Sequence, residues 1–112
     1  MSQLLERQIV ETARALISDK IHWVRDVYSE DDVGDPCHWS SKSAYRFCAQ
    51  AALWRAAYDV TLNVPTARSL GEKIIKSLPL VADDSLQGIN HAHGHKAVLA
   101  LFDEYLDKMK AA

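Results

Sequence analysis

The residues with the clearest chemical potential form a histidine cluster in the last quarter of the chain. Three of the five histidines lie within five residues, at His91, His93 and His95. In an extended segment alternate side chains point the same way, and in a helix His91 and His95 share one face at the i, i+4 spacing of helical zinc sites. The cluster therefore permits zinc or a similar divalent metal in a metal-dependent enzyme. Either Cys37 and His38 or Asp83 and Asp84 could complete the ligand set.

The favoured interpretation of the same cluster is structural. The chain has no HExxH or paired CxxC pattern that would fix a ligand set. Asn90 or His95 can cap the final helix while His91 and His93 stay in solvent. A pH-dependent surface is a weaker third interpretation, because imidazoles titrate near neutrality. We therefore expect no cofactor and keep the metal site as the alternative.

Two cysteines, Cys37 and Cys48, lie eleven positions apart. Neither their number nor their spacing indicates a disulfide framework or a zinc knuckle, so we expect reduced thiols. Cys48 stands in an apolar run and is expected to pack as a small apolar residue rather than to act as a nucleophile. Cys37 is the more exposed candidate, and its redox or nucleophilic reactivity depends on whether His38 or Arg46 lies close enough to favour the thiolate.

Aromatic residues form a second candidate site. They are Trp23, Tyr28, Trp39, Trp54 and Tyr58. These rings either line an apolar ligand pocket between a long loop and the central helix or cover a small helical core. Trp39 has polar neighbours and is the least easily assigned to the core, so it is the best candidate for a binding or dimer contact. Trp39, Trp23 and Asn90 make up the predicted ligand-binding or partner-binding set.

Helices are predicted to position these residues. Apolar residues recur at helical spacing in four segments: 3–18, 43–60, one from the capping signal at 63–66 to Leu78, and 95–110. Ser2 is the expected cap of the first helix, and a serine between 40 and 43 that of the second. Pro79 ends the third helix. Gly71 inside that helix costs about 1 kcal/mol relative to alanine, which hints at close packing there.

The connections between these helices differ in length. The connection 19–42 loses the helical period and carries acidic, glycine and proline residues, so it is expected to be a long irregular loop with a short extended piece at 21–28. The connection 80–94 is expected to hold one helical turn near Asp83. We predict an all-α fold over 1–112, a single small domain of about four helices with the long loop between the first two.

Composition narrows the possible classes of protein. The chain has 112 residues, of which 48% are hydrophobic, and 13 basic against 15 acidic residues give a formal charge of -2. This length suits one domain with its own core. The basic residues are dispersed, so we expect no nucleic-acid binding. Neither a membrane span nor a signal peptide is visible, so we expect no membrane association and a cytoplasmic location.

The order of several short motifs resembles that of a family of small, uncharacterised bacterial proteins. The family pattern is a tryptophan, an acidic loop, an Arg-Trp-Cys to Gly-Ala-Leu helix, and an Asn-Asp turn before a Val-Leu-Ala-Leu-Phe-Asp helix. The corresponding segments here are 22–23, 31–34, 46–53, 89–91, 94–95 and 98–103. Phe47, Ala51 and His91 depart from the pattern, replacing Trp, Gly and Asp. The resemblance implies a small cytoplasmic helical domain and supplies no reaction.

The sequence favours a non-enzymatic binding module over an enzyme. It contains no complete catalytic set, and its aromatic residues and alanine-rich central helix leave apolar surface for a small ligand or a protein partner. We expect the module to self-associate as a homo-oligomer. The alternative function is the metal-dependent enzyme built on His91, His93 and His95.

Overall fold

The computed structural model describes residues 3–81 and 84–111, and five α-helices account for most of them. The helices are α1 (Gln3–Leu16), α2 (Ala49–Thr61), α3 (Val64–Ser77), α4 (Leu86–Ala92) and α5 (His95–Ala111). A short 3-10 helix, η1 (Lys20–His22), follows α1. The mostly helical fold is confirmed, whereas the predicted number of helices is too low. Ser2 and Asp83 lie outside the described residues.

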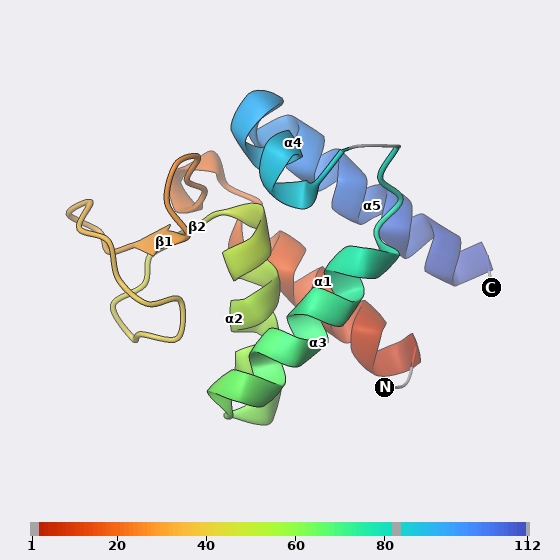
Figure 1. Cartoon of the computed structure of the whole chain (residues 1–112), viewed down its shortest axis with the longest axis horizontal. Helices are drawn as coiled ribbons and strands as arrows, with labels where there is room; N and C mark the ends of the chain where they lie inside the picture. The colour runs from red at the N-terminus through yellow and green to blue at the C-terminus, as the bar shows by residue number, and fades with distance from the viewer. Residues whose placement is uncertain (1–2, 82–83, 112) are drawn as a thin grey trace.

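Helix α2 is the centre of the fold and contacts α1, α3 and α4 (Figure 1). Its alanines at 49, 51, 52, 56 and 57 are fully buried, as is Leu53. Small side chains let neighbouring helices approach closely, so the apolar stripes of α1 and α3 can both pack against it. Burial of these surfaces against α2 is the main source of stability.

Helix α3 packs on α2 at Gly71. A Cβ atom at this position would lie 2.4 Å from Cδ1 of Trp54, a distance that non-bonded carbon atoms do not reach. The Trp54 ring is buried, and its Nε1 donates to Oε1 of Glu72 at 3.2 Å. Gly71 therefore makes room for this ring, which confirms the close packing predicted from its position inside a helix.

Helices α1 and α5 are joined by polar contacts at the edge of the core. Arg14 pairs with Asp103 through two hydrogen bonds. The buried Tyr105 donates its hydroxyl to Oε2 of Glu6 at 3.1 Å. Burial and the adjacent Glu6 carboxylate raise the pKa of Tyr105 to about 12.

The long connection 19–42 is more regular than the irregular loop with a short extended piece at 21–28 that the sequence predicts. Strand β1 (Ser29–Glu30) pairs antiparallel with β2 (Arg46–Phe47), and Trp23 forms a further bridge to Phe47. The buried Ser29 donates its hydroxyl to the carbonyl of Cys37 at 2.6 Å, which closes the chain between the strands. The strand pair and its loop extend from one end of the helical body (Figure 1).

Two helix predictions need correction. Helix α2 begins at Ala49 rather than at 43, because residues 46–47 are paired as β2 and the sulfur of Cys48, not a serine hydroxyl, accepts the Ala51 amide as the cap. The connection 80–94 holds the seven-residue helix α4, capped by Ser85, instead of a single turn. Buried Leu86 and Asn90 fix α4 on the core.

The other helix limits agree with the sequence. The side chain of Asn63 caps α3, which ends at Ser77, directly before Leu78 and Pro79. Helix α5 starts at His95 as predicted. Among residues 3–81 and 84–111, we find no helix with the length and apolar character needed to cross a membrane.

Candidate functional site

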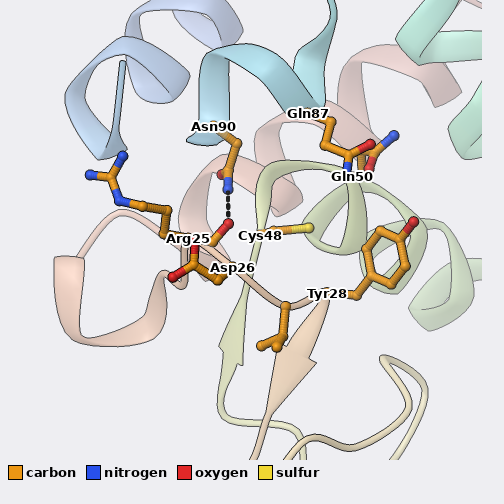
Figure 2. Close-up of a pocket in the computed structure, with 8 residues that line it drawn as sticks. Arg25, Asp26, Tyr28, Cys48, Gln50, Gln87 and Asn90 are labelled. Carbon is orange, nitrogen blue, oxygen red and sulfur yellow. Dashed lines mark hydrogen bonds between the residues drawn. The ribbon is translucent and has the colours of Figure 1, made fainter. Parts of the chain in front are cut away.

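A cavity of about 210 Å³ lies where three parts of the chain meet: the segment 25–28, the start of α2, and α4 (Figure 2). Its lining residues are Arg25, Asp26, Val27, Tyr28, Cys48, Gln50, Gln87 and Asn90. Tyr28 and Gln87 are exposed, so the cavity is open to solvent at their side. Small-molecule sites are concave and carry a few convergent polar groups, and this cavity has both properties.

The amide of Asn90 holds the three parts of the chain together. Its Oδ1 accepts hydrogen bonds from Nε1 of Trp23 at 2.7 Å and from the backbone N–H of Ala49 at 3.0 Å. Its Nδ2 donates to the carbonyls of Val24 and Arg25, both at 3.2 Å. Figure 2 shows the bond to Arg25. Because this buried amide is fully used inside the protein, Asn90 positions the cavity walls rather than offering free groups to a ligand.

Cys48 contributes a neutral thiol to the cavity. Its sulfur accepts the backbone N–H of Ala51 at 3.4 Å at the N-terminus of α2. Burial raises the pKa of the Cys48 thiol above its ordinary value. This effect outweighs that of hydrogen bonds from nearby backbone N–H groups, including those of Gln50 and Ala51, which lower the pKa. Among the described residues that line the cavity there is no histidine. A thiol without a base or a lowered pKa is a poor nucleophile, so this geometry favours binding over thiol catalysis.

Gln50 brings an unsatisfied polar atom to the cavity. Its Oε1 is buried and accepts no hydrogen bond from the described residues. Buried acceptors are nearly always paired, and leaving one unpaired costs roughly 1–3 kcal/mol.

Two charged residues lie at the outer edge of the cavity and bind other groups. The guanidinium of Arg25 donates to the carbonyl of His91 and lies over the Trp23 ring, with 5.2 Å from Cζ to the ring centroid. Figure 2 shows that it points away from Cys48 and Gln50. Asp26 lies 3.1 Å from Nδ1 of His91.

The three histidines of the predicted metal site make separate contacts. His91 faces Asp26, whereas Nε2 of His95 is 2.5 Å from the carbonyl of Ile17. His93 lies on a different surface hollow, beside Leu80 and Glu104. Within residues 3–81 and 84–111, no group of three or more His, Cys, Asp or Glu side chains is arranged to hold a metal ion. The structure adds no support to this site, which stays a prediction.

Trp39 is a core residue, although its polar neighbours make it the aromatic residue least easily assigned to the core from sequence. Its ring is 4% exposed and lies 5.9 Å from the Trp54 ring and 6.2 Å from the Tyr58 ring, between centroids. The strand pair folds the polar segment around Trp39 back onto α2, and Arg55 holds it by donating to the carbonyl of Trp39 at 3.0 Å. Trp23 is also buried, and its indole N–H is used by Asn90.

Cys37 is partly buried, and its surroundings oppose reactivity. Burial and the charge of Asp31 raise the pKa of the Cys37 thiol. Nδ1 of His38 is 2.7 Å from the Ser40 hydroxyl, and Arg46 pairs with Glu30. Neither candidate activator is engaged with the thiol, so the thiolate is not favoured.

The structure places only part of the predicted binding set at the cavity. Asn90 lines it, and Tyr28 alone of the five aromatic candidates does so. The predicted location between the long connection and the central helix is close to that of the cavity. Gln50 and Gln87 were missed, because a single glutamine on a helix is usually a solvated residue and carries no sequence signal.

These features define a small helical domain with a polar-lined cavity held together by one buried amide. The chain belongs to a family of unknown function, DUF6197, whose model matches residues 1–107. This match confirms the resemblance to a family of uncharacterised small proteins. No curated protein and no solved structure matches the chain.

Proposed function

We propose that this protein is a binding module whose cavity between α2, α4 and the segment 25–28 takes a small polar ligand. The observation that carries the proposal is a cavity whose walls are held together by the buried Asn90 amide, with the exposed side chains of Tyr28 and Gln87 at its opening. The side-chain polar groups of Tyr28 and Gln87 make no hydrogen bonds to the described residues, so they can bind a ligand in the cavity.

The construction of the cavity supports the same function. Four hydrogen bonds from Asn90 fix the segment 23–25 and the start of α2 relative to α4. A cavity whose walls are held in place before the ligand arrives loses little conformational entropy on binding. Its volume of about 210 Å³ is below the roughly 300–1,000 Å³ of drug-sized sites, so it suits one ring or one small functional group.

A fragment screen observed by amide NMR tests this function. Isotope-labelled protein is mixed with small uncharged fragments, and shifts are mapped onto Tyr28, Cys48, Gln50 and Gln87. We expect hits that move the Gln50 side-chain amide and the α2 N-terminus. Gln8, an exposed glutamine on α1, is the internal control for non-specific contact. A screen in which shifts scatter over the surface, with none concentrated at the cavity, would refute the proposal.

A further inference from the structure

Arg25 differs from the other arginines of the chain because it has no acidic partner among the described residues. Each of the others forms an ion pair with a carboxylate: Arg7, Arg14, Arg46, Arg55 and Arg68. Asp26, the next residue along the chain, lies beside His91 instead. Arg25 therefore brings to the cavity a positive charge that no described carboxylate pairs with.

Uncharged groups hold the Arg25 side chain in place. Its Nη1 donates to the carbonyl of His91, and its Cζ lies 5.2 Å from the centroid of the Trp23 ring. Trp23 is itself fixed by the hydrogen bond from its indole N–H to Asn90. A guanidinium that is held in position before a ligand arrives loses little side-chain entropy on binding.

Two nitrogens of this guanidinium stay available. Nε and Nη2 of Arg25 donate no hydrogen bond to the described residues. The N–H groups of these two nitrogens lie on one side of the guanidinium and point in parallel, which is the geometry that binds both oxygens of a carboxylate. The free side of Arg25 therefore matches one carboxylate group.

Arg25 lines both the cavity and an adjoining hollow of about 650 Å³. The residues that line this hollow are Arg25, Asp26, Ser85, Gln87, Gly88 and His91. The Arg25 guanidinium points away from Cys48 and Gln50 (Figure 2), and it binds the carbonyl of His91, a residue of the hollow. A ligand can therefore place an uncharged body in the cavity and an acidic group in the hollow, beside Arg25.

The other charged residues of the hollow limit the charge of that acidic group. Asp26 lies 3.1 Å from Nδ1 of His91, and its side chain is 72% exposed, so water screens its repulsion of a single negative charge. Among the described residues that line the hollow, Arg25 is the only lysine or arginine. A second negative charge, as on a phosphate monoester, would lose water there without gaining a partner. The hollow consequently favours a monoanion.

The cavity sets the size and character of the uncharged body. Its volume of about 210 Å³ limits the inserted group to about one ring. Tyr28 presents a ring that is 51% exposed and lies 5.2 Å from the Trp54 ring, between centroids. Aromatic rings favour other rings in offset or edge-to-face contact, so an aromatic body gains affinity here.

From these observations we infer that the cavity and the hollow together bind a small aromatic monocarboxylate, with Arg25 as the residue that pairs with its carboxylate. This inference rests on the proposed function and specifies its ligand class. The ion pair adds affinity to a body that the cavity already accepts, so an uncharged analogue should bind in the same place but more weakly.

Four probes that share a phenylethyl group test the inference: 3-phenylpropanoate, 3-phenylpropanamide, 3-phenylpropylammonium and 2-phenylethylphosphonate. Each is titrated into isotope-labelled protein, at a pH where the phosphonate is a dianion, and followed at the Arg25 Nε–H and at the backbone amides of Tyr28 and Cys48. We expect the carboxylate to bind about tenfold more tightly than the amide, the effect of hydrogen bonds to a charged group. The phosphonate should bind more weakly than the carboxylate, and the ammonium most weakly.

Variants of Arg25 assign the effect to its guanidinium. In Arg25→Gln the preference for the carboxylate over the amide should disappear, whereas Arg25→Lys keeps a charge without the parallel N–H groups and should retain part of it. The control Arg7→Gln removes the same charge from α1, outside both linings, and should leave the preference unchanged. If Arg25→Gln no longer binds the amide, the cavity has changed, and the four probes on the natural protein decide the question.

The outcomes separate the inference from the function beneath it. If the amide, the ammonium or the phosphonate binds in the cavity of the natural protein as tightly as the carboxylate, the ligand class is wrong while the binding function stands. The same holds if none of the four probes binds but other fragments occupy the cavity. A preference that survives in Arg25→Gln refutes the role of Arg25. If no compound of any charge occupies the cavity, both the inference and the proposed function fail.

Discussion

Replacement of Gln50 with methionine should make the free protein more stable. Methionine has nearly the same length and helix propensity as glutamine but removes the buried oxygen that lacks a partner. Relief of an unpaired buried acceptor is expected to raise the free energy of unfolding by roughly 1–3 kcal/mol. For a chain of this size, each kcal/mol corresponds to a rise in melting temperature of about 4 °C. Urea denaturation monitored by tryptophan fluorescence gives the free energy directly.

The control for this measurement is Gln87→Met, at a cavity residue whose side chain is exposed. Its free energy of unfolding should change by less than about 0.5 kcal/mol, as is usual for surface positions. If Gln50→Met leaves stability unchanged or lowers it while the control behaves as expected, the Gln50 oxygen carries no desolvation cost.

Three further predictions concern the surrounding structure. Asn90→Ala removes four hydrogen bonds and leaves the Trp23 N–H unpaired, so urea denaturation should show a loss of about 3 kcal/mol or more; a loss under about 1 kcal/mol would contradict the role of Asn90. Gly71→Ala should lower stability by about 1–2 kcal/mol, because the clash with Trp54 exceeds the helix-propensity gain of about 1 kcal/mol; a more stable variant would disprove the close packing. The pKa of Tyr105 is raised to about 12, so its stabilising contribution is complete below its ordinary pKa of about 10 and is lost as the pH rises towards 12. Thermal melts between pH 9 and 12 should show a steeper decline for the natural protein than for Tyr105→Phe, and parallel curves would contradict the shift.

The sequence predicted those parts of the fold that leave a periodic or capping signal. The limits of α3 follow from Asn63 and Pro79, and the buried stripes of α1 and α5 follow from apolar spacing. The two-residue strands β1 and β2 are too short to show alternation, so they could not be recognised. Helix α4 has seven residues with Gly88 near its middle, and most of its stability comes from tertiary packing rather than from local propensity.

The site was less predictable than the fold because its walls come from separate segments. Asn90 and Tyr28 could be predicted as candidates, because Asn90 adjoins the histidine cluster and Tyr28 is an aromatic residue near the long connection. Gln50 and Gln87 lie far apart in the sequence, and no local sequence pattern around either residue shows that they line the same cavity. Trp39 is the opposite case. Its polar neighbours made a buried position hard to predict from sequence, but its ring packs in the core once the strand pair has formed.

The side chain of Asn90 also has a consequence for the order of folding. It bridges positions 65 to 67 residues earlier in the chain, on the segment that precedes β1. Contacts at such separation form only after a large loop has closed, which is slow compared with helix formation. During synthesis, a nascent chain can assemble α1, α2 and α3 well before residue 90 leaves the ribosome. The cavity is therefore completed only after α4 has joined α1, α2 and α3.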